Sequence, residues 1–150
     1  SRENDLETVR RCHAHLTENG ALWINIDAEY AFPDTWKLWL PENAGSLPEP
    51  WPEEGSRDVA ADGSEHRAYF HMLHLDPVEQ TFTREVRLEK WVSGTLVASE
   101  EHTLRGNMYL KNELLLMLRV AGFRDVSVTG DYTNEPATRA HREMIFTAVK

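Results

Sequence analysis

The sequence predicts an α/β domain with three core strands, two main helices and an antiparallel extension of three strands. Two helical stretches are each followed by a short apolar strand, and the long stretch between them is rich in strand formers that alternate in polarity. The chain has 150 residues and a mass of 17.3 kDa, which suits one hydrophobic core. We therefore expect residues 1–150 to form a single domain.

The first helix and the first core strand are expected before residue 28. Apolar residues recur at helical spacing over residues 5–16, where Asp5 can cap the helix and Gly20 can stop it. Residues 21–27, ALWINID, form a short and mostly apolar run that is typical of a buried strand. A helix, a glycine turn and a buried strand together indicate an α/β unit.

Residues 30–56 break this pattern and predict a long loop with one helical turn near residues 34–40. Five of the seven prolines and three of the five tryptophans lie here. Long loops are uncommon in compact domains unless they cover something, and tryptophan is costly to leave in water. We interpret the loop as a lid. The alternative is that its aromatic side chains anchor an irregular loop to the core.

Three antiparallel strands are expected next, over residues 66–75, 80–92 and 95–104, because strand formers dominate there between turn signals. In the middle strand one face is mainly apolar and the other is polar, so one side of this sheet should face solvent.

The C-terminal part predicts a second α/β unit. Residues 110–121 form a strongly apolar helix that stops at Gly122, and residues 123–128 form a strand. A long connection over residues 130–142 then leads to a final strand at residues 144–149.

Charge and composition exclude several classes of partner. Lys and Arg total 16 against 25 Asp and Glu, a net charge of −9 that repels phosphate backbones and anionic lipids, so we expect no nucleic acid and no membrane partner. The single cysteine cannot form an internal disulfide, and the expected location is cytoplasmic. Residues 1–5 have no initiating Met and no signal-peptide pattern, as expected for a chain that begins inside a longer gene product.

No metal site is predicted. His71 and His74 are three residues apart on a predicted strand and point to opposite faces. His13 and His15 diverge by about 200° on a helix. Cys12 follows Arg10 and Arg11 in sequence and is expected to have a small hydrophobic role on the first helix.

Two stretches of the chain resemble a known family. Residues 11–26, RCHAHLTENGALWINI, resemble the stretch of class I S-adenosylmethionine-dependent methyltransferases in which a helix ends in His-Leu-x-x-Gly-Gly and enters the fifth strand. The second stretch resembles the last helix and sixth strand of that superfamily. The residues that carry this resemblance are Leu104-Arg105, Tyr109, Glu113-Leu114 and Leu118-x-x-Ala121-Gly122-Phe123. One departure is Leu110, where the family often has a Ser or Thr cap.

The remaining segments extend the resemblance over nearly the whole chain. Residues 145–150, IFTAVK, are similar to the family's seventh strand, which runs antiparallel to the rest. Residues 66–104 resemble the insertion from which small-molecule members build a substrate cap. The resemblance thus implies the C-terminal half of a Rossmann-like methyltransferase sheet with an antiparallel three-stranded cap insertion.

The family's cofactor motif has no counterpart in this sequence. The Gly-rich turn after the family's first strand and the acid that ends its second strand hold the cofactor, and both would precede Ser1. The resemblance therefore implies S-adenosylmethionine as cofactor of the full-length protein, no cofactor-binding residues in this chain, and a chain that is inactive alone.

Contacts to the methyl acceptor are implied after the fifth strand and on the cap. The implied substrate-binding residues are Asp27, Glu29, Tyr30, Trp36, Trp39, Arg105 and Tyr109. An in-line methyl transfer needs no fixed triad, so no catalytic base is identified. Arg105 has the alternative role of a structural ion-pair partner. The turn at residues 130–132 either lines the mouth of the pocket or is a plain turn.

The expected function is that of the substrate-binding portion of a methyltransferase with a small-molecule acceptor. One alternative is a non-catalytic α+β domain that binds a small ligand. Another is a homo-oligomer in which swapped halves rebuild a sheet, because the strand at residues 22–26 would otherwise have an unpaired apolar edge.

Overall fold

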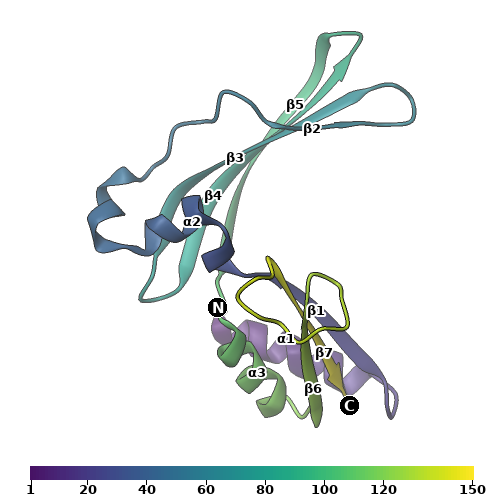
Figure 1. The fold of residues 1–150 in the computed structure, drawn as a ribbon. Coiled ribbons are helices and arrows are strands. Elements are labelled where there is room, and N and C mark those ends of the chain that lie inside the picture. The colour runs from purple at the N-terminus through teal and green to yellow at the C-terminus, as the bar shows by residue number, and fades with distance from the viewer. The chain divides into compact units, whose positions relative to one another are not determined.

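The computed structural model describes all of residues 1–150, which divide into two compact units (Figure 1). Unit 1 consists of residues 1–37 and 109–150, and unit 2 consists of residues 38–108. Each unit has its own cluster of buried apolar side chains. The expectation of a single domain stays a prediction, and the two units are described separately.

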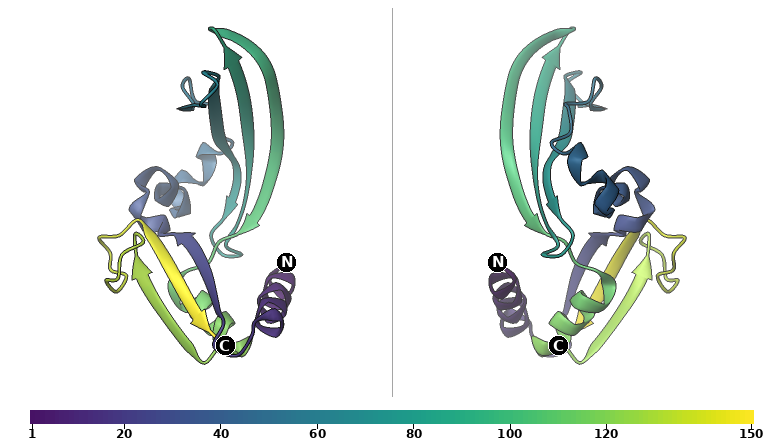
Figure 2. Two further views of the ribbon diagram at one scale, coloured as in Figure 1. Left: turned by 90° about the vertical axis from the view of Figure 1, so that its right-hand side faces the viewer. Right: turned by 90° about the vertical axis from the view of Figure 1, so that its left-hand side faces the viewer.

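Unit 1 is a three-stranded sheet with two helices on one face (Figure 2). The strand order is β1-β7-β6, and β7 runs antiparallel to both of its neighbours, which confirms the antiparallel final strand. The helices and strands are α1 (Arg2–His15), β1 (Ala21–Asp27), α3 (Lys111–Val120), β6 (Asp125–Gly130) and β7 (Glu143–Val149).

The core of unit 1 joins both helices to the sheet. Phe146 of β7 and Leu118 of α3 are fully buried, and Val9 of α1 packs in the same cluster. The opposite face of the sheet is more open, since the Trp23 side chain on β1 is 71% exposed.

The two helices of unit 1 are capped in different ways at their N-termini. Helix α1 begins at Arg2, because the Ser1 side chain accepts a hydrogen bond from the backbone N–H of Asn4 at 3.4 Å. The prediction that Asp5 caps this helix was therefore wrong, and Asp5 lies instead in the first turn, where the helix dipole favours a negative charge. Helix α3 has no side-chain cap from Leu110, but the Glu113 carboxylate accepts from the Leu110 N–H at 3.0 Å.

Unit 2 contains a four-stranded antiparallel sheet in the order β2-β3-β4-β5. Its strands are β2 (Ser56–Val59), β3 (Glu65–Asp76), β4 (Thr81–Val92) and β5 (Thr95–Asn107). The three predicted strands are confirmed as β3, β4 and β5, but the three-stranded extension was wrong by one strand. Strand β2 escaped prediction because its four residues are all exposed and show no apolar alternation.

Short helices replace most of the predicted long loop. They are η1 (Glu29–Ala31), α2 (Pro33–Trp36), η2 (Lys37–Trp39) and η3 (Pro41–Ser46). Leu38 is buried in the core of unit 2 with Leu75 and Met108, and Trp39 packs against the same cluster. The structure thus favours an anchoring role for Trp39, whereas the lid stays a prediction.

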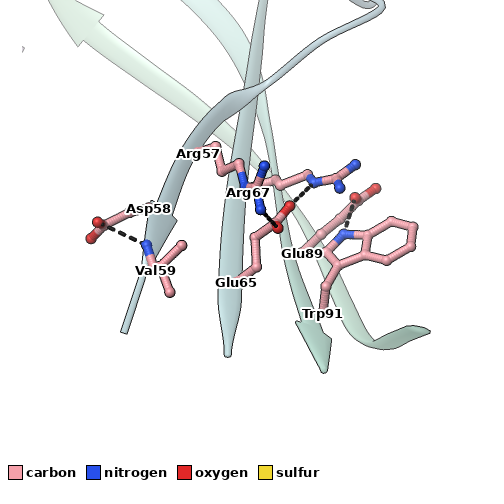
Figure 3. A network of polar contacts seen from close by, with 7 residues as sticks. All are labelled: Arg57, Asp58, Val59, Glu65, Arg67, Glu89 and Trp91. Carbon is pink, nitrogen blue, oxygen red and sulfur yellow. Dashed lines mark hydrogen bonds and ion pairs between the residues drawn. The ribbon is translucent and has the colours of Figure 1, made fainter. Parts of the chain in front are cut away.

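One face of the unit 2 sheet carries a network of charged side chains (Figure 3). Glu65 accepts a hydrogen bond from Nε of Arg67 and ion-pairs with Arg57, and the indole N–H of Trp91 donates to Glu89 at 2.9 Å. The hydrogen bond from Arg67 is the main cause that lowers the pKa of Glu65. These residues form the polar side that the alternation in β4 predicts.

None of the helices combines the length and the apolarity needed to cross a membrane.

Candidate functional site

A cavity of about 390 Å³ lies in unit 1 where β1 ends. The strand register explains its place: Asp27 at the end of β1 pairs with Glu143 at the start of β7, and Gly130 at the end of β6 pairs with Met144. The segment after β1 and the connection from β6 to β7 therefore leave the sheet at the same end. The cavity is lined by Asp27, Glu29, Tyr30, Tyr109, Leu110, Lys111, Asn112, Glu113, Ala137, Thr138, Arg139 and Met144.

Four of the seven predicted substrate-binding residues line this cavity. Asp27 is the last residue of β1, Glu29 and Tyr30 lie in η1, and Tyr109 directly precedes the N-cap of α3. Segments far apart in the sequence thus bring these side chains to one site.

The other three predicted residues lie elsewhere in the chain. Trp36 ends α2 in unit 1, where it is 36% exposed, and it does not line the cavity. Trp39 and Arg105 belong to unit 2, where Trp39 packs against the core and Arg105 is exposed on β5 opposite Thr83. A substrate contact by these three side chains stays a prediction.

Tyr109 is held from the side of α1. Its hydroxyl donates a hydrogen bond to Oδ2 of Asp5 at 2.7 Å, and the guanidinium carbon of Arg2 lies 4.7 Å from the centre of its ring. Burial, together with the hydrogen bond to Asp5, raises the pKa of Tyr109 to about 12. The phenol is therefore neutral at physiological pH.

Tyr30 is held from the β6–β7 connection. Its hydroxyl donates to the backbone carbonyl oxygen of Thr138 at 3.5 Å. Residues 133–142 were predicted only as part of a connection, so Ala137, Thr138 and Arg139 were not among the predicted site residues. The predicted order of the strands could have indicated these residues. One strand ends and the next begins at the same end of the sheet, so the connection between them lies at that end.

A second cavity in unit 1, of about 460 Å³, is lined by Phe32, Asp131, Tyr132, Arg142 and Glu143. The guanidinium carbon of Arg142 lies 4.8 Å from the centre of the Phe32 ring. Tyr132 is 68% exposed, and its hydroxyl oxygen accepts a hydrogen bond from Asn25. Asp131 and Tyr132 thus line this second cavity and do not line the cavity at the end of β1, so a place for this turn at the mouth of the acceptor pocket stays a prediction.

The wall of this second cavity is strained. Asp131 and Tyr132 have φ values of 47° and 56°, a left-handed conformation that costs about 1–3 kcal/mol for each residue other than glycine. Oδ1 of Asp131 offsets part of this cost by accepting from the backbone N–H groups of Arg142 and Glu143, at 2.8 Å each. The same hydrogen bonds lower the pKa of Asp131.

The residues of this chain do not fit a Gly-rich cofactor cradle. Such a cradle needs a glycine turn between the end of a strand and the start of a helix. Here β1 leads into η1 through Ala28, and the glycines with positive φ are Gly63 and Gly94 in hairpins and Gly122 after α3.

Solved structures of two methyltransferases are similar to this chain. A S-adenosylmethionine-dependent methyltransferase from Clostridium acetobutylicum ATCC 824 matches 99% of this chain and 52% of its own length, with a TM-score of 0.65 and 9% identity. The CcbJ methyltransferase from Streptomyces caelestis matches 99% of this chain and 53% of its own length, with a TM-score of 0.62 and 15% identity. No family model matches the sequence, and no curated protein matches it as a relative.

The chain therefore spans about half the length of the two enzymes that it resembles. At identities this low, the structural similarity establishes the fold, whereas activity and substrate need other support. We conclude that residues 1–150 have a mixed α/β fold that is similar to the matching halves of these two methyltransferase structures.

Proposed function

We propose that this chain is the substrate-binding, C-terminal portion of a S-adenosylmethionine-dependent methyltransferase that acts on a small molecule. The observation that carries the proposal is the cavity at the end of β1, because it collects four residues that the resemblance assigns to the methyl acceptor. The antiparallel β7 between β1 and β6 supports the same assignment.

The size and the walls of the cavity suit a small molecule. Ligand pockets commonly have volumes of about 300–1,000 Å³, and this one has about 390 Å³. The rings of Tyr30 and Tyr109 and the apolar Leu110, Ala137 and Met144 give surface for an apolar part of a ligand. The polar residues at the end of β1 and in η1 orient it. In this proposal the chain binds and orients the acceptor, and S-adenosylmethionine supplies the methyl group when it is bound by the full-length protein.

The open edge of β1 suits a further strand. β1 hydrogen-bonds only to β7, and an unpaired strand edge is a template for pairing with another strand. We infer that the Gly-rich half that holds the cofactor would pair at this edge. A second copy of the chain is the competing occupant, and it would give a homo-oligomer.

Calorimetry with S-adenosylmethionine tests this division of labour. The native gene product should bind the cofactor, and residues 1–150 should bind it weakly or not at all. The mass of the native gene product, measured in the same preparation, shows whether it is heavier than the 17.3 kDa of residues 1–150. A native product of about this mass that binds no cofactor would reject the methyltransferase proposal.

A second candidate function is a non-catalytic domain that binds a small ligand. Such a domain would use the same cavity at the end of β1, whose lining joins apolar side chains with carboxylates. Under both functions we expect no nucleic-acid or membrane partner, because of the charge of −9. We also expect a cytoplasmic location, because the chain has a single cysteine.

A further inference from the structure

We infer that His141 positions one wall of the cavity at the end of β1, and that protonation of this histidine in mild acid releases the wall. The inference deepens the proposed function and rests on it in one respect, that this cavity is the acceptor site. It is carried by a hydrogen bond to the imidazole ring whose donor is a backbone N–H.

The wall in question belongs to the connection from β6 to β7 (Figure 1), where Ala137, Thr138 and Arg139 line the cavity. Ala137 is fixed to the sheet, because its backbone N–H donates to the carbonyl oxygen of Val128 on β6 at 3.0 Å. Thr138 and Arg139 have no backbone hydrogen bond to a strand. Their place therefore depends on the turn that ends at His141.

His141 closes this turn around Thr138. Nδ1 of His141 accepts a hydrogen bond from the backbone N–H of Thr138 at 2.9 Å, and the backbone N–H of His141 donates to the carbonyl oxygen of Thr138 at 3.2 Å. A backbone N–H can only donate, so Nδ1 must offer a lone pair. The ring is therefore neutral in this arrangement, with its proton on Nε2.

The sheet fixes the ring that fixes Thr138. Gly130 ends β6, is buried and pairs with Met144 of β7. A Cβ at Gly130 would overlap the imidazole of His141, so the ring lies directly against the backbone of this glycine. A larger residue at position 130 would displace the ring and with it the acceptor for the Thr138 N–H.

Protonation of His141 removes this acceptor without moving the ring. An imidazolium carries a proton on both nitrogens and cannot accept from the N–H of Thr138. Two donors then face each other, and the turn must open to give both of them other partners. His141 is half-buried, so water can deliver the proton.

The charged groups near the ring can accommodate the imidazolium. The pKa of Asp131 is lowered by the backbone hydrogen bonds that its carboxylate accepts and, after them, by the positive charge of His141. Arg139, Arg142 and Glu143 flank the ring in sequence and carry two positive charges and one negative charge. Because Asp131 supplies a counter-charge, the loss on protonation is the acceptor for Thr138.

NMR of residues 1–150 between neutral pH and about pH 5, where histidine ordinarily titrates, tests the inference. At neutral pH the ¹⁵N shifts of His141 should show a proton on Nε2 and none on Nδ1. As His141 takes up its second proton, the amide of Thr138 should shift with it and exchange faster with solvent. The amide of Ala137, which is bound to Val128, should do neither and is the internal control.

Variants separate the acceptor from the rest of the side chain. His141→Asn offers an amide oxygen near the position of Nδ1 and takes up no proton, so its Thr138 amide should stay unchanged with pH. His141→Leu has no acceptor, and its Thr138 amide should exchange fast at every pH. His102→Asn, at an exposed histidine of β5, is the matched control and should behave like the parent.

A third variant reaches the same hydrogen bond from the other side of the ring. Gly130→Ala leaves His141 in the sequence but takes the room that its ring occupies, so the Thr138 amide should exchange fast at neutral pH. If His141→Leu or Gly130→Ala does not fold, the comparison of the parent with His141→Asn decides by itself.

Benzyl alcohol, which is uncharged over this pH range, reports the cavity itself. We expect saturable shifts of the Thr138 and Met144 amides at neutral pH, since both residues line the cavity. The affinity of the parent should fall at least about 3-fold at about pH 5, as for the loss of one hydrogen bond in the wall. The affinity of His141→Asn should be the same at both pH values.

Four results would overturn the inference. They are a Thr138 amide that does not follow the protonation of His141, an acid response that persists in His141→Asn, affinity of the parent for benzyl alcohol that does not change with pH, and no saturable binding at millimolar concentration. The proposed function fails by a different measurement. A native gene product without methyl transfer rejects that function and leaves the result for His141 intact, whereas a Thr138 amide independent of His141 does the reverse.

Discussion

Nε2 of His71 lies 2.9 Å from Oε2 of Glu85, while Nδ1 of the same ring lies 2.6 Å from the backbone carbonyl oxygen of Glu49. Both partners are acceptors, so both ring nitrogens must carry protons, and only the imidazolium form has two. Trp51 stacks on this ring at a centroid distance of 4.0 Å. His71 thus fastens the segment after η3 to the sheet of unit 2.

The protonation of His71 should make the stability of the chain depend on pH. Burial alone lowers the pKa of His71, but the hydrogen bonds to Glu49 and Glu85 outweigh it, and the pKa lies above its ordinary value of 6.5. Because the folded state binds this proton more tightly, the stabilisation is complete below pH 6.5 and is lost as the pH rises through the folded pKa. Urea unfolding of the chain and of His71→Gln at several pH values measures this loss.

The difference in free energy of unfolding between the parent chain and His71→Gln, taken at each pH, isolates His71 from the other six histidines. It should shrink as the pH rises. His74→Gln, at an exposed position of the same strand, should keep the pH dependence of the parent chain. A difference between parent and His71→Gln that stays constant with pH would show that His71 is not protonated in the fold.

Trp36 and Trp39 should separate when each is replaced by Ala. Trp39 packs against Leu38, Leu75 and Met108, so Trp39→Ala should lower the free energy of unfolding by about 3 kcal/mol, at the low end for tryptophan truncation. Trp36 is 36% exposed, and Trp36→Ala should lower it by less than about 1 kcal/mol. Denaturant unfolding measures both values.

The lid hypothesis adds a second measurement for the same variants. If residues 30–56 close over a bound acceptor, Trp36→Ala should weaken acceptor binding in the full-length enzyme at nearly unchanged stability. Equal affinities in the parent and in Trp36→Ala would reject the lid for this residue.

The raised pKa of Tyr109 predicts a loss of stability at alkaline pH. The unfolded phenol titrates near 10 and the folded one at about 12, so the folded state binds this proton more tightly. The contribution is therefore complete below pH 10 and is lost as the pH rises to about 12. Tyr109→Phe should remove this part of the alkaline slope in thermal unfolding. If the slope is the same in both proteins, the hydrogen bond to Asp5 does not hold the phenol in its neutral form.

The open edge of β1 predicts self-association of the isolated chain. β1 hydrogen-bonds only to β7, and Trp23 on the same strand is 71% exposed. Sedimentation velocity at several concentrations should show a dimer or larger species, and Trp23→Lys should shift the chain toward monomer. A parent chain that stays monomeric and binds no apolar dye would mean that this edge is protected.

Much of the fold could be predicted from the sequence because its elements are long and periodic. The strand at residues 21–27 was predicted with the bounds of β1, and β3, β4 and β5 differ by at most three residues from their predictions. β2 is too short and too polar to show a pattern. The cap by Ser1 was missed because the apolar periodicity starts at Leu6, one turn later.

The site could be predicted only in part, because its residues come from several segments. Asp27, Glu29, Tyr30 and Tyr109 were implied by resemblance and lie together at the cavity. Thr138 and Asp5 were not selected, since the first acts through its backbone and the second through a hydrogen bond to Tyr109 across the fold. Such partners are set by tertiary packing, which no local pattern records.

The methyltransferase proposal is tested by transfer of a radiolabelled methyl group from S-adenosylmethionine to small molecules by the native gene product. We expect a labelled small-molecule product with the native gene product and no transfer by residues 1–150 alone. Tyr109→Phe in the native product should raise KM for the acceptor more than that for S-adenosylmethionine. A native product that transfers no label to any small molecule, or residues 1–150 that bind the cofactor with a Kd of about 1 μM, worth about 8 kcal/mol, would contradict it.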